Sequence, residues 1–107
     1  MGFQIGGAIL DFIVLSILHN QDQYGYSLTR QVREILDVSE TSLYPALKRL
    51  QKLGYLEAYD KPFQGRMRKY YRISESGQEY YADTALQWKQ FEAQVDQLLE
   101  GDVPCEY

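Results

Sequence analysis

Hydrogen-bonding and basic side chains are concentrated on one side of an expected helix over residues 39–53. At helical spacing, Leu43, Leu47 and Leu50 form an apolar stripe, and polar residues fall mainly on the other side. The polar residues that we single out as candidate binding residues are Thr41, Ser42, Tyr44, Lys48 and Arg49. Hydroxyl, amine and guanidinium groups are the side chains that bind phosphate oxygens and base edges. By itself the pattern also fits an ordinary amphipathic helix with a solvated face.

A basic hairpin is expected directly after this helix. Residues 55–59 and 67–73 are β-prone runs of alternating character, and residues 62–65 between them are typical of a turn. The residues near the tip that suit phosphate or a narrow minor groove are Lys61, Gln64, Gly65, Arg66, Arg68 and Lys69. A basic loop is often only solvated surface. A helix beside a positively charged β-ribbon, however, is the arrangement of a winged helix-turn-helix, and it predicts double-stranded DNA as a partner.

The charge of the chain is unevenly distributed. The formal net charge is -4, which alone argues against nucleic acid. Residues 1–74, however, carry ten basic and seven acidic side chains, whereas residues 75–107 carry one and eight. Because charges act over about 10 Å in physiological salt, DNA would meet the local positive field of the hairpin and helix. The acidic C-terminal segment is then a separate surface.

Several classes of function find no support in the sequence. No glycine-rich phosphate loop, metal-ligand cluster or nucleophile–base pattern is visible, so we expect no enzyme activity, catalytic residue, metal or cofactor. The single Cys105 gives no disulfide framework, which together with the lack of a signal peptide suggests a reducing cytoplasm. The longest apolar run, residues 8–18, contains Asp11 and Ser16 and is too short to span a bilayer. His19 is expected in a solvated loop.

Two helices are expected before the polar helix. Residues 8–18 are apolar nearly all round, which indicates a helix covered on more than one side, either in the core alone or partly by a second subunit. A buried strand is the alternative for so short a run. Gly25 marks a turn. The apolar positions of the second helix are Leu28, Val32, Ile35 and Leu36.

Helix-end signals define the boundaries of the third and last helices. Ser39 is a suitable N-cap, and Leu53 extends the apolar stripe up to Gly54, which suits the position after the helix end. Pro45 inside the helix costs about 3 kcal/mol as a rule and predicts a small kink. Ser74 is the expected N-cap of the last helix.

The last helix is expected from Glu75 to about Glu100, and its apolar residues follow a 3,4 spacing. This seam, interrupted once by Thr84, needs a surface to pack against. We expect the first helix of the same chain and a two-fold related copy of the chain to supply that surface. The expected dimer-interface residues are Ile9, Phe12, Ile13, Tyr81, Trp88, Phe91, Val95 and Leu98.

Three motifs follow one another along the chain. The first is Tyr24-Gly25-Tyr26-x-Leu28. The second, which Gly54 follows, is Ser39-x-x-Ser42-Leu43-Tyr44-Pro45-Ala46-Leu47-x-Arg49-Leu50. The third is Gly65-Arg66-x-Arg68-Lys69-Tyr70-Tyr71-Arg72-Ile73-Ser74-x-x-Gly77. Together they resemble the PadR family of bacterial transcriptional regulators over roughly residues 8–100, and the single C-terminal helix resembles its small subfamily.

The resemblance implies a mostly α fold with a small β-hairpin. Residues 1–74 would form a winged helix-turn-helix DNA-binding domain, and residues 75–107 a C-terminal dimerisation helix and tail. It also implies a homodimeric repressor that binds operator DNA through the third helix and the wing. An alternative is a winged helix that binds another protein and never meets DNA, which the acidic last helix favours.

Trp88 is the candidate ligand-binding residue. Some small members of the family, such as a lactococcal multidrug-binding regulator, bind planar aromatic drugs between their subunits. In that regulator a tryptophan stands eleven residues after the glycine that follows the wing, and Trp88 stands eleven residues after Gly77. The resemblance therefore implies release by a small aromatic effector. The alternative is that the indole packs a dimer interface or core without any ligand.

Overall fold

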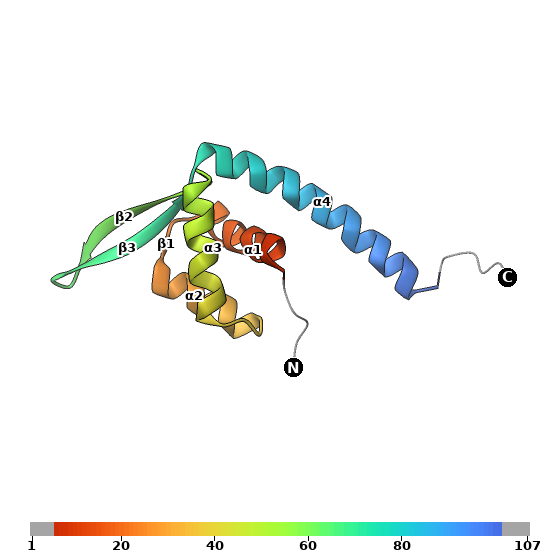
Figure 1. Cartoon of the computed structure of the whole chain (residues 1–107), viewed down its shortest axis with the longest axis horizontal. Coiled ribbons are helices and arrows are strands. Elements are labelled where there is room, and N and C mark those ends of the chain that lie inside the picture. Colours follow the sequence, from red (N-terminus) through yellow and green to blue (C-terminus); the bar gives the residue numbers. More distant parts are fainter. Residues whose placement is uncertain (1–5, 102–107) are drawn as a thin grey trace.

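The chain folds into a small helical body with a β-hairpin at one end and a long helix leaving it at the other (Figure 1). The computed structural model describes residues 6–101. The elements of that part are α1 (Gly7–Asn20), β1 (Gln23–Tyr24), α2 (Gly25–Ile35), α3 (Glu40–Lys52), β2 (Leu56–Phe63), β3 (Arg66–Ile73) and α4 (Glu75–Leu99). This order confirms the expected winged helix-turn-helix with an added C-terminal helix.

A short strand, β1, extends the hairpin to a three-stranded antiparallel sheet of order β1-β3-β2. In it Gln23 pairs with Tyr71 and Tyr24 pairs with Tyr70. The sequence signals only a turn here, because a two-residue strand has no visible periodicity. Gly25 then begins α2, where an added Cβ would stand 3.1 Å from the Tyr71 ring. Close packing of strand and helix therefore favours glycine at this junction.

The core lies between α1, α2, α3 and the base of the sheet. Its fully buried side chains include Val14, Leu15, Leu18, Leu28, Leu43, Leu47, Leu50 and Leu56. The run over residues 8–18 is a helix, not a strand, and it buries one side only. Ile9 remains 41% exposed, so the single chain leaves the other side of α1 partly uncovered.

Two residues that were expected in the core are exposed. Ile35 is 84% exposed and Leu53 is 57% exposed. Ile35 is the last residue of α2 and Leu53 is the C-cap of α3, so both lie beyond the edge of the core although their helical phase is right. Thr29 and Ala46 are buried in these helices instead.

The ends of α3 follow the expected signals only in part. The Ser39 carbonyl accepts hydrogen bonds from the amides of Ser42 and Leu43 at 3.1 and 3.2 Å. Its hydroxyl caps no amide, contrary to expectation, and bonds the Thr41 hydroxyl at 2.7 Å instead. Pro45 lies inside a single helical segment that continues to Lys52.

The hairpin strands are longer than expected. They run from Leu56 to Phe63 and from Arg66 to Ile73, so only Gln64 and Gly65 form the turn. Both have positive φ, 49° and 79°, as a two-residue turn between twisted strands requires. The expected core positions Leu56, Ala58, Tyr71 and Ile73 do face the body, since all four belong to the core or pack against it.

The start of α4 is fixed against the end of α3. As expected, the Ser74 hydroxyl accepts a hydrogen bond from the Gly77 amide at 3.0 Å. The Ser74 and Ser76 hydroxyls donate to the Gly54 carbonyl at 2.5 and 2.9 Å. From this point α4 crosses α1 and continues beyond the body, away from the hairpin (Figure 1).

His19 is exposed to solvent as expected, but it does not lie in a loop. It belongs to the last turn of α1, and its Nδ1 lies 2.7 Å from Gln78 Oε1. Its ring stacks on Tyr81 with a centroid separation of 4.5 Å. His19 therefore helps to join α1 to α4, which the sequence could not show because the two helices are distant along the chain.

Candidate nucleic-acid interface

The polar side of α3 points away from the core. Leu43, Leu47 and Leu50 hold the opposite side of the helix in the core, with exposed fractions of 0%, 1% and 0%. The candidate residues Thr41, Ser42, Tyr44 and Lys48 are all exposed. The helix thus presents three hydroxyl groups and an ammonium group on one accessible surface.

Tyr44 and the wing strand β3 line the same groove. The other lining residues are Tyr24, Gly25, Tyr26, Met67, Arg68, Lys69 and Tyr71. Burial raises the pKa of the Tyr71 hydroxyl, with a smaller contribution from Tyr44 nearby, so the Tyr71 side chain is neutral at ordinary pH. The groove therefore brings the recognition-helix candidate and the basic wing to one side of the molecule.

The tip of the wing is open. Gln64, Gly65 and Arg66 are exposed at the end of the hairpin, and an added Cβ at Gly65 would meet nothing within 4 Å. Glycine is favoured here by its φ of +79°, not by lack of space. The hairpin projects from the body beside α3 (Figure 1).

Lys61 and Arg68 lie over aromatic rings. The Lys61 ammonium is 5.4 Å from the Tyr70 ring centroid. The Arg68 guanidinium carbon is 4.5 Å from the centroid of Tyr24 and 3.9 Å from that of Phe63. Lys61 is exposed, whereas Arg68 is half-buried.

The Arg49 side chain forms an ion pair with Asp11 of α1. Its Nε and Nη2 donate to the Asp11 carboxylate at 3.0 and 2.5 Å, a bidentate pair that joins α3 to α1. Asp11 is only 8% exposed, and its hydrogen bond raises the pKa of the Arg49 guanidinium. A buried carboxylate needs such a partner. The pair gives Arg49 a structural role that the sequence could not reveal across 38 residues, while its side chain stays 43% exposed, so its contact with DNA stays a prediction.

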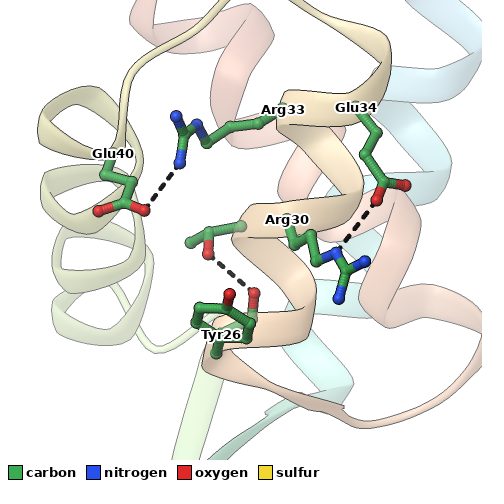
Figure 2. Close-up of a pocket in the computed structure, with 6 residues that line it drawn as sticks. Tyr26, Arg30, Arg33, Glu34 and Glu40 are labelled. Atoms are coloured by element: carbon green, nitrogen blue, oxygen red, sulfur yellow. Dashed lines mark hydrogen bonds and ion pairs between the residues drawn. The ribbon is translucent and has the colours of Figure 1, made fainter.

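A second polar hollow lies between α2 and the start of α3 (Figure 2). Its charges are paired, since Arg30 bonds Glu34 at 3.1 Å and Arg33 bonds Glu40 at 2.8 Å. Thr29 donates to the Tyr26 carbonyl at 2.9 Å. Such paired surface charges suggest no chemistry of their own.

Two exposed groove residues, Tyr26 and Met67, were not among the candidates chosen from the sequence. Tyr26 and Met67 line the groove and are 57% and 64% exposed. Tyr26 belongs to the first sequence motif, which was a usable signal. Met67 lies on the same side of β3 as Lys69 and Tyr71, so the alternation along the strand was a usable signal for it.

An aromatic cluster joins α1 to the middle of α4. Phe12 stacks on Tyr81 at 5.6 Å, and its ring centroid is 6.3 Å from that of Trp88. Trp88 is in turn 6.3 Å from Phe91. Of the expected interface residues, Phe91 and Leu98 are 55% and 64% exposed and Ile9 is also exposed. The others, Ile13 and Val95 with Phe12, Tyr81 and Trp88, are half-buried in the single chain.

Among residues 6–101, no group of three or more His, Asp or Glu side chains is placed to hold a metal ion. Within the same residues, no helix has the length and apolar character to cross a membrane.

Comparison with known proteins identifies the family. Residues 14–83 match the model of the transcriptional regulator PadR-like family. A crystal structure of a Streptococcus mutans protein has a TM-score of 0.89 at 31% identity, covering 99% of this chain and 100% of that one. A PadR family transcription regulator from Clostridium difficile gives a TM-score of 0.78 at 30% identity, covering 84% and 97%.

A PadR-like transcriptional regulator from Bacillus cereus gives a TM-score of 0.77 at 34% identity, covering 86% of this chain and 92% of that one. The family match runs from the second half of α1 to the start of α4 and includes every residue that lines the groove. The chain therefore belongs to the PadR-like family of transcriptional regulators and is a DNA-binding regulator, not an enzyme.

Proposed function

We propose that the chain acts as a homodimeric repressor that binds an operator through α3 and the wing. The observation that carries this proposal is the groove lined jointly by Tyr44 of α3 and by Met67 and Lys69 of β3. Two elements that face one duplex from the same side can engage it together. The open polar side of α3 suits the major groove, and the wing tip suits the adjacent phosphates.

The contacts divide by chemistry. Thr41, Ser42 and Tyr44 offer hydroxyl groups, which mostly bind the sugar–phosphate backbone and fix the register of the helix. Lys48, Lys61, Arg66 and Lys69 offer positive charge, which supplies the salt-dependent part of the affinity. Gln64 and Gly65 allow the backbone of the turn to approach the duplex.

The proposed dimer uses the uncovered sides of α1 and α4. Phe91 and Leu98 leave apolar surface exposed on a helix that extends beyond the body, and Ile9 does so on α1. A second copy would cover these residues and place two copies of α3 about one turn of DNA apart. A change in the angle between the two α4 helices would change that spacing.

Release by a small aromatic molecule is the proposed regulatory step. Trp88 lies between Phe12 and Phe91, where it is only half-buried in the single chain. A planar ligand that stacks on this indole at the dimer interface would bind the DNA-competent and incompetent arrangements unequally, which is the requirement for an effector. Quenching of tryptophan fluorescence by a panel of planar aromatic compounds tests this step, and a DNA-bound fraction unchanged by every quencher would refute release.

A salt titration of DNA binding tests the main proposal. The probe is the promoter region of the chain's own gene, and the variants are Arg66→Ala and, as a matched control, Lys89→Ala on α4. Each lost phosphate contact removes about 0.9 from the slope of log affinity against log salt, so a dimer with two wings should lose about twice that for Arg66→Ala. Lys89→Ala should keep the wild-type slope.

The opposite result would support the protein-binding alternative. If the wild-type chain shifts no DNA at low salt, or Arg66→Ala behaves as Lys89→Ala does, the operator proposal fails. A partner protein that binds the Arg66→Ala variant as tightly as the wild type would then assign the surface to protein recognition.

A further inference from the structure

The outer face of the sheet carries a connected set of aromatic rings and cations. The Tyr24 ring lies 5.8 Å from Tyr70, which stacks on Tyr59 at 5.7 Å. Arg72 covers Tyr59 at 5.1 Å, and the Tyr59 hydroxyl donates to Asp22 at 2.6 Å. These side chains engage one another, so the set is better suited to rigidity than to stacking with free bases.

Arg68 links all three strands of this face. It lies on the central strand β3, and its guanidinium contacts Tyr24 of β1 and Phe63 of β2, at 4.5 and 3.9 Å from the ring centroids. Both rings are diagonal neighbours, since Tyr24 pairs with Tyr70 and Phe63 pairs with Arg66. A planar guanidinium stacks on aromatic rings in a way that an ammonium group does not.

The outer part of the hairpin has few other contacts that could hold it to the rest of the sheet. β1 pairs only with Tyr70 and Tyr71, so the hairpin between Lys69 and Arg66 has two strands and no third. An isolated two-stranded ribbon is marginally stable in water. Arg68 lies in this two-stranded part and reaches back to Tyr24, which is also the N-cap of α2. The contact therefore ties the projecting ribbon to the helix-turn-helix.

We propose that Arg68 is a positioning residue, whose guanidinium stacks between Tyr24 and Phe63 to fix the direction of the wing, and that it does not bind phosphate. The part that concerns DNA rests on the proposed operator function. Arg68 is half-buried, whereas Arg66 and Lys69 on the same strand are exposed, and this difference in burial supports different roles for them. Arg66 supplies the charge at the tip, and Arg68 holds the tip in place.

Hydrogen exchange tests the positioning role without DNA. Phe63→Leu removes a ring and keeps every charge, whereas Arg68→Lys keeps the charge and removes the planar group. A cation–π contact at an exposed site contributes enough that the amides of residues 61 and 63–67 should exchange about 2- to 5-fold faster in either variant. Arg66→Lys, the same chemical change two residues away, is the matched control and should exchange as the wild type does. Wild-type exchange in both test variants would overturn the proposal.

DNA binding tests the consequence for the operator. Because both variants keep the charge of the wing, each should weaken operator affinity by about 2- to 5-fold with the salt slope unchanged. If Arg68 instead binds phosphate, Phe63→Leu should bind as tightly as the wild type and only Arg68→Lys should bind more weakly, and that result would overturn the proposal. A wild-type chain that binds no DNA would refute the operator function, whereas the exchange measurement would still decide the role of Arg68.

Discussion

The two halves of α4 carry similar apolar side chains but differ in what surrounds them. In residues 75–88, Gly77 is buried and Tyr80, Tyr81 and Trp88 are half-buried against the body. In residues 89–99, Phe91, Leu98 and Leu99 are 55%, 64% and 79% exposed. One continuous helix thus has a docked half and a projecting half (Figure 1).

The difference shows that helical spacing alone does not decide burial. The 3,4 seam continues through both halves, yet only the half that crosses α1 finds partners within its own chain. Surface apolar side chains in a row on a monomer commonly mark an interaction site. We therefore expect substitutions in the docked half to change the stability of the chain and substitutions in the projecting half to change its association.

The largest effect is expected from Gly77→Ala in the docked half. An added Cβ would stand 2.0 Å from the Tyr55 carbonyl oxygen and 2.8 Å from Ile73 Cγ1, so the backbone of α4 would have to move. Overpacking against backbone should lower the free energy of unfolding by about 3 kcal/mol, measured by urea denaturation. Gly6→Ala, where a Cβ meets nothing within 4 Å, is the matched control and should change it by less than about 0.5 kcal/mol. Equal stability of the two variants would mean that the docked half is not tightly held.

The projecting half is tested by the double variant Phe91→Glu with Leu98→Glu. Placing two charges in an apolar interface should weaken self-association by at least about 100-fold, measured by analytical ultracentrifugation. Gln90→Glu with Gln97→Glu adds the same charges at the same spacing on exposed polar positions and should leave association near the wild-type value. A double variant at positions 91 and 98 that associates like this control would argue against the proposed dimer.

Phe12 of α1 packs against the docked half of α4, where its ring centroid lies 5.6 Å from that of Tyr81 and 6.3 Å from that of Trp88. Phe12→Leu keeps most of the apolar volume and removes the aromatic pairs. We expect a loss of about 1 kcal/mol in unfolding free energy and a shifted emission maximum of Trp88. Ile9→Leu, on the exposed side of the same helix, should alter neither quantity. An unchanged Trp88 spectrum in Phe12→Leu would mean that the cluster does not form in solution.

The smallest effect is expected from Ser76→Ala at the start of α4. The Ser76 hydroxyl donates to the Gly54 carbonyl at 2.9 Å, but Ser74 donates to the same oxygen, so the carbonyl keeps a partner. The loss should be about 0.5 kcal/mol. Ser74→Ala should cost about 1 kcal/mol, because it also removes the N-cap bond to Gly77. Thermal unfolding of both variants gives the comparison, and a larger loss for Ser76→Ala would reverse the assigned roles.

Residue types and spacing along the chain were enough for the local features of the fold. Ser74 and Gly54 lie at the helix ends where they were expected, and the apolar stripe formed by Leu43, Leu47 and Leu50 is buried. The hairpin follows from its β-prone strands and from the turn at Gly65. These features rest on contacts between near neighbours, which a linear sequence displays directly.

Contacts between distant residues were decided by the tertiary structure. The pairing of Arg49 with Asp11, the stacking of His19 on Tyr81 and the place of Arg68 between two rings each join separate elements. From the sequence, Arg49 and Arg68 are known only as basic residues, and their partners within the chain are visible only in the structure. Which partner a basic side chain reaches depends on the packing of helices and the register of strands, and these are fixed only when the whole chain folds.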